Sequence, residues 1–318
     1  MSENHNLILG IDGGGTKTVA CLAQVVPDGS FHVVGRGQSG SSNLKAVGPE
    51  KALENLAEAL DQAWSDAQVA PESVSLAVLG LSGAGRPEAQ SLLQQWNTEN
   101  RIAHKLSIVH DALPVLAAGT PDGSGVALIA GTGSVAFAAD SNRKTAVVGG
   151  WGYWFGDEGS AFWLGQAALR AASLASDGRS PATQLLEAIL DRLSISDPRE
   201  MLTSLARCGD VRSAIAGLAD LVSIAADQQD TAALEIVSQA AGHLAALVVA
   251  AAKQLELGMR FPLALAGGVL SGSQLIREAL LGELAARGVS PDSVQLVTDP
   301  VNGCLKVAMC EITSQSSA

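Results

Sequence analysis

The chain has 318 residues, of which 47% are hydrophobic, so it is long enough for two domains that each bury a core. A formal net charge of -12 leaves no general basic surface for nucleic acid or an anionic membrane. The four cysteines form no C-x-x-C pair and no histidine cluster accompanies them, which argues against a zinc site or a disulfide framework.

The first half of the chain predicts a three-stranded meander followed by alternating helices and strands. Short apolar runs separated by glycine-rich or polar turns predict the meander, and apolar residues at steps of three and four predict the first helix. The predicted elements are strands over 7–11, 19–26 and 31–35, a helix over about 50–67, a strand over 75–79, a helix from about Pro87 and a strand over 106–109.

The same order of elements begins again at Val126. A strand, the turn 131–134, and two more strands repeat the meander, and the segments 263–272 and 294–303 match 76–85 and 106–115 in order. One such match is weak, but the ordered set favours a duplication. We therefore predict an N-terminal domain over 1–118 and a C-terminal domain over 119–318, with an inserted helical region over about 156–230. A helix from about 301 can pack back on the first domain.

Two domains built on one plan are expected to enclose a central cleft, with ligands at the strand ends that line it. The N-terminal apolar run is too short for a signal peptide, and the longest apolar run, 244–252, is far shorter than a membrane span. We expect a cytoplasmic protein.

The turn at 12–18 reads D-G-G-G-T-K-T. It resembles a Walker A loop, but Thr16 separates Gly15 from Lys17, and the residues that follow predict a hairpin instead of a helix. An unliganded hairpin is the ordinary interpretation of such a turn. Consecutive glycines also let backbone N–H groups approach phosphate oxygens. Asp12 favours phosphate binding, because a carboxylate beside a phosphate is favourable chiefly when Mg²⁺ lies between them.

A second glycine turn, containing Thr132 and Gly133, occupies the matching place in the second half. Two such turns facing one cleft would hold a polyphosphate from both sides, which is what phosphoryl transfer requires. Gly267 and Gly268 precede a predicted helix and can let a nucleoside lie against them. Close packing of a strand on a helix explains them equally well.

Asp111 ends a predicted strand and precedes a predicted helix. Capping that helix is its more frequent role, but in the cleft it is the best candidate to accept the proton of an attacking hydroxyl group. Asp299 has the equivalent place in the second half and is expected only to cap. The segment 149–159 combines aromatic residues, carboxylates and glycines, which fits a carbohydrate pocket, although Trp154 and Phe155 can also belong to a core.

Together these motifs resemble the N-acetylglucosamine kinases and the BadF/BadG/BcrA/BcrD-type ATPases of the actin and hexokinase superfamily. The resemblance covers nearly the whole chain and rests on DGGGTKT, GSSN, HDA, AGTGS, GGWGYWFGDEGSAFWLG, LAGGV and NGCLKVA, of which GGWG followed by GDEGSA is the most specific. It implies an α/β protein with two duplicated actin-like, ribonuclease H-like ATPase domains. It also implies an ATP- and Mg²⁺-dependent kinase that phosphorylates the 6-hydroxyl group of N-acetylglucosamine.

The resemblance also implies a role for individual residues, with Asp111 as the catalytic base and Asp12 near the metal. Val135 departs from the animal enzymes, which carry an asparagine there, so glucosamine and N-acetylmuramic acid stay open as substrates. The implied ATP contacts are Gly13, Gly14, Gly15, Thr16, Lys17, Thr132 and Gly133, and the implied sugar contacts are Asn43, Gly150, Trp151 and Asp157, with Ser82 a weaker one.

Two alternatives come from other functional classes. An ATP-driven activator of a 2-hydroxyacyl-CoA dehydratase would hold an iron–sulfur cluster between subunits, but Cys208 and Cys304 lie in unpromising contexts. A non-catalytic sugar sensor would carry a DNA-binding module, and no such module precedes residue 7. The sequence is compatible with a homodimer and does not determine the oligomeric state.

Overall fold

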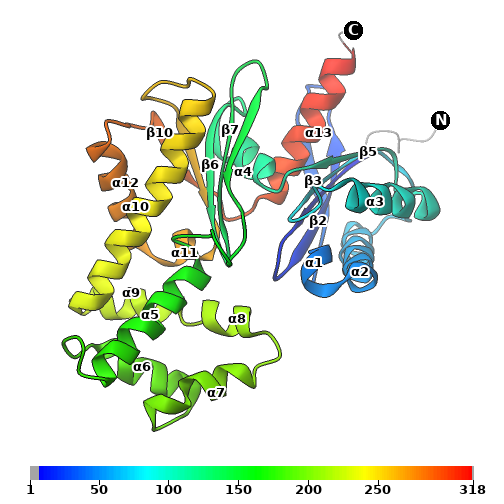
Figure 1. Cartoon of the computed structure of the whole chain (residues 1–318). Helices are drawn as coiled ribbons and strands as arrows, with labels where there is room; N and C mark the ends of the chain where they lie inside the picture. The colour runs from blue at the N-terminus through cyan, green and yellow to red at the C-terminus, as the bar shows by residue number, and fades with distance from the viewer. Residues whose placement is uncertain (1–6, 317–318) are drawn as a thin grey trace. The chain divides into compact units, whose positions relative to one another are not determined.

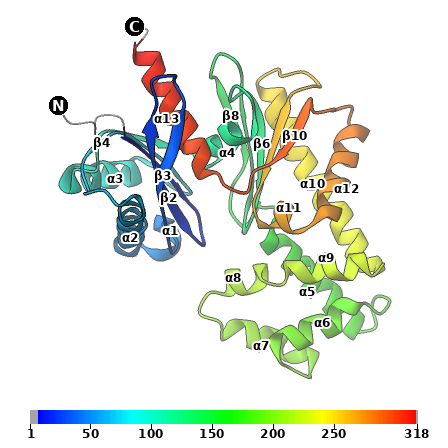
Figure 2. The same ribbon diagram turned by 180° about the vertical axis from the view of Figure 1, so that it is seen from behind.

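The computed structural model describes residues 7–316, and the chain divides into two compact units. The first unit contains the chain up to Gly123 together with the segment from Asp299, and the second unit is Ser124–Thr298. This boundary lies a few residues from the predicted one, and the C-terminal segment belongs to the first unit. Figures 1 and 2 show the elements of each unit from two sides.

The first unit is built on a five-stranded sheet with the order β3-β2-β1-β4-β5. The predicted meander is confirmed, because β1–β2 and β2–β3 pair antiparallel, whereas β1–β4 and β4–β5 pair parallel. The elements are β1 (Leu7–Gly13), β2 (Thr18–Val25), β3 (Phe31–Ser39), α1 (Leu44–Val47), α2 (Pro49–Ala67), β4 (Val74–Leu81), α3 (Pro87–Asn100), β5 (Ala103–Val109), α4 (Ala112–Gly119) and α13 (Val301–Ser316).

Helices cover both faces of this sheet, so its strands are apolar on both sides. Successive side chains of a strand point to opposite faces, and accordingly Leu9 packs in the core under α2, whereas Ile8 packs in the core under α13. The strand β3 approaches α2 closely, since a Cβ atom at Gly37 would collide with the backbone oxygen of Ala59. Figure 1 shows α13 running beside these strands.

The second unit repeats the topology of the first. Its sheet has the order β10-β9-β6-β7-β8, and when it is followed from the meander edge at β8 it has the same succession as β3-β2-β1-β4-β5. The predicted duplication is therefore supported by strand order as well as by sequence. The elements are β6 (Gly125–Ala130), β7 (Ser134–Ala139), β8 (Thr145–Gly149), α5 (Ala161–Ser176), α6 (Gln184–Leu193), η2 (Pro198–Glu200), α7 (Met201–Ala206), α8 (Val211–Ala216), α9 (Ala219–Asp227), α10 (Thr231–Gln254), β9 (Pro262–Ala266), α11 (Gly268–Gly272), α12 (Gln274–Ala286) and β10 (Ser293–Leu296).

The helices α5 to α9 form the predicted insertion, and they group beyond one end of the sheet in both views (Figures 1 and 2). The apolar run 244–252 is part of α10, which at 24 residues is long and apolar enough to cross a membrane. However, α10 packs on β6, β7 and β8, and Leu244, Ala245 and Val248 are fully buried in the core of the unit. It is a core helix whose small residues extend well beyond the run seen in the sequence.

Candidate active site

The first glycine turn is an open hairpin in the first unit. It connects β1 to β2, and the backbone N–H of Gly14 donates to the oxygen of Lys17 at 3.0 Å. Cβ atoms placed on Gly14 or Gly15 would meet no atom within 4 Å. Thr16 and Lys17 are exposed. The predicted hairpin context is confirmed, and the backbone at the tip has room for a ligand.

Two other segments lie against this turn. The backbone N–H of Ser82 donates to the oxygen of Gly13 at 2.8 Å, and the hydroxyl group of Ser41 donates to the oxygen of Gly14 at 3.0 Å. A Cβ atom at Gly13 would collide with the Oγ atom of Ser42. That Oγ atom is buried and has no hydrogen-bond partner among residues 7–316. Neither serine of the 41–42 pair was predicted to be functional from the sequence.

Asn43 and Ser82, both proposed as sugar contacts from the resemblance, meet beside the same turn. The side-chain Nδ2 of Asn43 lies 3.5 Å from the hydroxyl oxygen of Ser82. The Oδ1 atom of Asn43 also accepts from the backbone N–H of Lys45 at 3.0 Å and so caps α1. The side chain is therefore held in place by the helix that it begins.

Asp12 is the most strongly perturbed carboxyl group at this turn. Burial raises its pKa to about 7, the negative charges of Asp111 and Asp299 add to this rise, and Lys17 partly offsets it. A cation beside Asp12 would relieve the same repulsion. Mg²⁺ is typically held by one or two carboxylates together with water and phosphate oxygens, so the donor set near Asp12 fits this ion.

Asp111 does not use its carboxylate to cap α4. It stands at the N-cap position with φ -57° and ψ -23°, and its side chain makes no capping hydrogen bond. Its Oδ1 atom lies 3.0 Å from Nδ1 of His110, and the side chain is 27% exposed. A partly exposed carboxylate next to the perturbed Asp12 is a suitable proton acceptor.

Asp299, for which only a capping role was predicted, also forms an ion pair within the first unit. Its two carboxylate oxygens accept from the guanidinium group of Arg36 at 2.7 and 2.9 Å, and this pairing holds the pKa of Asp299 below its usual value. Arg36 lies on β3, far away in the chain, so no local sequence signal connects the two residues. The pair joins the start of the C-terminal segment to the meander of the first unit.

The second glycine turn is closed by a hydrogen bond from the N–H of Gly131 to the oxygen of Gly133 at 2.9 Å. Asp157 lies directly beneath it, because a Cβ atom at Gly133 would be 2.8 Å from the Asp157 carboxylate. The N–H of Ser134 donates to Oδ1 of Asp157 at 3.3 Å. The N–H of Gly150 donates to the oxygen of Ser134 at 2.9 Å. The second unit therefore brings the turn and two of the proposed sugar residues together.

Asp157 is only 4% exposed and has a φ of 61°, a conformation unusual for a residue other than glycine. Burial raises its pKa, and hydrogen bonding from Ser134 and the charge of Arg212 act in the opposite direction. Trp151 is 74% exposed. Trp154 and Phe155 are 80% and 75% exposed, so the interpretation of these two residues as core is wrong.

Gly267 and Gly268 differ in what surrounds them. A Cβ atom at Gly267 would collide with the backbone oxygen of Ala130, and its φ of 95° also requires glycine. Close packing of strand and helix therefore accounts for Gly267. A Cβ atom at Gly268 would meet no other atom within 4 Å, so the backbone there is open.

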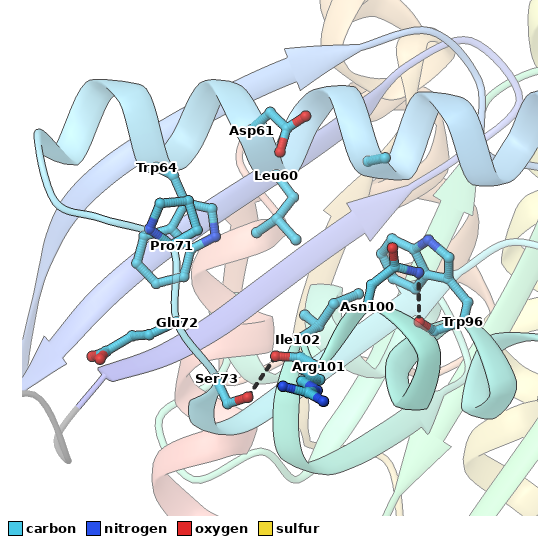
Figure 3. A pocket seen from close by; sticks show the side chains of 11 residues that line it. Leu60, Asp61, Trp64, Pro71, Glu72, Ser73, Trp96, Asn100, Arg101 and Ile102 are labelled. Atoms are coloured by element: carbon cyan, nitrogen blue, oxygen red, sulfur yellow. Dashed lines mark hydrogen bonds between the residues drawn. The ribbon is translucent and has the colours of Figure 1, made fainter.

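A pocket of about 400 Å³ lies elsewhere on the first unit (Figure 3). It is lined by Trp64 and Trp96, and by Ser73 and Ile102, which come just before β4 and β5. Asp111 and the glycine turn follow the carboxyl ends of β5 and β1, which run parallel to β4. The pocket therefore lies at the opposite end of the sheet from the candidate site.

Comparison with known proteins identifies the family. The model of the BadF/BadG/BcrA/BcrD ATPase family matches residues 9–293, which is most of the chain. The chain belongs to the BadF/BadG/BcrA/BcrD ATPase family. The resemblance that the motifs suggested is thereby confirmed.

Individual relatives align with this chain over almost their full length. An N-acetylmuramic acid/N-acetylglucosamine kinase of Clostridium acetobutylicum is 27% identical, over 96% of this chain and 98% of the relative. A structure provisionally described as an N-acetylglucosamine kinase of Chromobacterium violaceum has a TM-score of 0.75 at 27% identity, over 96% of this chain and 99% of the other.

The fold extends to more distant enzymes. A hexokinase of Schistosoma mansoni in complex with glucose has a TM-score of 0.61 at 14% identity, over 96% of this chain and 86% of the other. The predicted fold class, two duplicated actin- and hexokinase-like α/β domains, is confirmed by this likeness and by the two matching sheets.

Proposed function

We propose that the chain is an ATP-dependent amino-sugar kinase that transfers the γ-phosphate of ATP to the 6-hydroxyl group of N-acetylglucosamine. The observation that carries the proposal is that the carboxylates of Asp111 and Asp12 lie close enough to interact electrostatically, beside an open glycine turn. Asp111 is partly exposed and makes no capping bond, so its carboxylate is available to a substrate. The names of the full-length relatives support the amino-sugar class.

The proposed ATP contacts are backbone N–H groups and a few donors of the two glycine turns. Gly13, Gly14 and Gly15, with Thr16 and Lys17, would bind phosphate oxygens from one unit, and Thr132 and Gly133 from the other. With a net charge of -12, the protein must obtain phosphate affinity from such local donors. The open backbone at Gly268, next to the tightly packed Gly267, is the proposed contact for the nucleoside.

Asp12 is the proposed metal-holding residue. Mg²⁺, when bound, neutralises developing charge on the transferred phosphoryl group. Because burial and neighbouring carboxylates raise the pKa of Asp12 to about 7, the ionised form is unfavourable by itself and is favoured by a nearby cation. A cation bound beside Asp12 would therefore favour its ionised form.

In the proposed reaction, the 6-hydroxyl oxygen of the sugar attacks the γ-phosphorus of ATP, and ADP leaves. Asp111 accepts the proton of that hydroxyl group. Asn43, Ser82, Gly150, Trp151 and Asp157 would orient the sugar. The first two are held together by their own hydrogen bond, and Gly150 and Asp157 are tied to the second glycine turn. Positioned side chains of this kind lower the entropic part of the barrier.

N-acetylmuramic acid is the second substrate that an observation favours, because the Clostridium relative is named for both sugars. Glucosamine stays open because Val135 stands where the animal enzymes carry an amide. A dehydratase activator is disfavoured, since the thiol of Cys304 is fully buried and donates to the oxygen of Ile11 at 3.3 Å. We propose a cytoplasmic location, where ATP is available.

The test is a coupled measurement of ADP release from Mg-ATP with N-acetylglucosamine, N-acetylmuramic acid, glucosamine and glucose. We expect sugar-dependent release with the highest kcat/KM for an amino sugar. The variant Asp111→Asn serves as the matched control for contaminating kinases. Absence of stimulation by all four sugars would overturn the proposal.

A further inference from the structure

Arg212, on the short helix α8 of the insertion, reaches the buried Asp157. Its guanidinium Nη2 lies 3.2 Å from Oδ2 of Asp157, and the other carboxylate oxygen accepts from the backbone N–H of Ser134. The two oxygens of Asp157 thus connect the inserted helices to the second glycine turn. This contact spans 55 residues of sequence, and nothing local in the sequence indicates it.

The same guanidinium group also contacts the aromatic segment that precedes Asp157. It lies 5.1 Å from the ring centroid of Tyr153, within the range of a cation–π interaction. Tyr153 in turn stacks on Trp154 at 5.1 Å and meets Phe162 edge-on at 5.1 Å. One side chain from the insertion therefore holds two points of the 149–159 segment, four residues apart.

Arg212 occupies this position at a cost. Its Nε atom is buried and has no hydrogen-bond partner within the described part of the chain, and an unpaired buried donor is unfavourable. The backbone of Asp157 is in the left-handed region, which persists only where surrounding contacts impose it. The helix α8 is itself fixed, because a Cβ atom at Gly165 of α5 would collide with the backbone oxygen of Ile215.

We propose that Arg212 is a positioning residue through which the helical insertion holds Asp157 and the aromatic segment in the arrangement that binds the sugar. The inference rests on the proposed function. It assigns the insertion a part in sugar affinity, whereas ATP contacts of the first unit are left unaffected. Removal of Arg212 would free Asp157 and Tyr153 together.

The test compares Arg212→Gln and Arg212→Lys with Arg207→Gln, an exposed arginine of the same insertion. We expect Arg212→Gln to raise the KM for N-acetylglucosamine about tenfold, which corresponds to about 1.4 kcal/mol. The KM for ATP should rise less, by about twofold to threefold, because Asp157 also lies beneath the second glycine turn. Arg212→Lys keeps the charge but not the planar group over Tyr153, and should rescue only part of the loss. Arg207→Gln should behave as the wild type.

A second readout does not depend on catalysis. Chymotrypsin cleaves after exposed aromatic residues, and the 151–155 segment should be cut faster in Arg212→Gln while the thermal unfolding midpoint stays near that of the wild type. Unchanged sugar KM together with unchanged cleavage would overturn the positioning role. Faster cleavage in a protein whose wild type phosphorylates no sugar would retain the role for Arg212 and reject the kinase proposal instead.

Discussion

At the scale of single residues, the proposed reaction depends first on the carboxylate of Asp111. Asp111→Asn removes the proton acceptor while keeping the size of the side chain. We expect kcat to fall on the order of a hundredfold or more, with sugar affinity measured by calorimetry nearly unchanged. Asp227→Asn, at an exposed position on α9, is the matched control. Near-normal turnover in Asp111→Asn would remove this residue from the mechanism.

The raised pKa of Asp12 leads us to expect that this residue lowers the stability of the protein at alkaline pH although the proposed function requires it. Its folded pKa of about 7 lies above the ordinary value of 3.8, so between these values the folded state binds more protons than the unfolded state. Stability contributed by this group is therefore present at low pH and is lost as the pH rises through about 7. Without nucleotide and metal, Asp12→Asn should be more stable than the wild type by about 1 to 2 kcal/mol at slightly alkaline pH.

Urea unfolding of Asp12→Asn and wild type at two pH values measures this effect. The difference should be largest above the folded pKa and should vanish below the ordinary pKa of aspartate, while the variant loses kinase activity at both. A variant that is less stable at alkaline pH would contradict the electrostatic description of the site.

The candidate residues at the ends of strands could be proposed from the sequence, whereas the arginines that contact the candidate site from distant parts of the chain could not. Asp12 and Asp111 could be proposed because each lies at the end of an apolar segment, Asp12 directly after Ile11 and Asp111 two residues after Val109. Arg36 and Arg212 could not, since their partners lie 263 and 55 residues away. The sequence also could not show that Trp154 is exposed, because an aromatic residue is compatible with a core or a surface until its neighbours are known.

At the scale of elements, close approach between α2 and β3 depends on glycine. Gly37→Ala should lower the free energy of unfolding by about 1 to 3 kcal/mol, because the added Cβ atom collides with the backbone of α2. Gly85→Ala, where a Cβ atom would meet no other atom within 4 Å, is the control and should change stability by less than about 0.5 kcal/mol. Equal changes in the free energy of unfolding of the two variants, measured with urea, would show that the close approach of β3 to α2 does not require glycine at position 37.

Most strands and the long helices could be predicted, because their apolar periodicity is strong and the second half repeats the first. The short helix α1 was not predicted, since its four residues are too few for a periodic pattern. The insertion was predicted as helical without its individual helices. The contact between the insertion and Asp157 depends on tertiary packing, which apolar periodicity does not reveal.

At the scale of the whole molecule, the first unit requires the C-terminal segment. The helix α13 supplies Val301, Cys304 and Leu305 to one core of that unit, and a Cβ atom at Gly303 would collide with the backbone of Pro114. Deletion of residues 299–318 should therefore abolish cooperative unfolding of the first unit, measured by hydrogen exchange. Wild-type protection of β1 and β4 in the truncated chain would contradict this arrangement.

In the proposed function, the phosphoryl group of ATP is transferred to a sugar and not to water. The most direct measurement is the phosphorus NMR spectrum of the products formed from Mg-ATP and N-acetylglucosamine. We expect ADP and an equal amount of N-acetylglucosamine 6-phosphate. ADP with inorganic phosphate and unmodified sugar would contradict the proposed function.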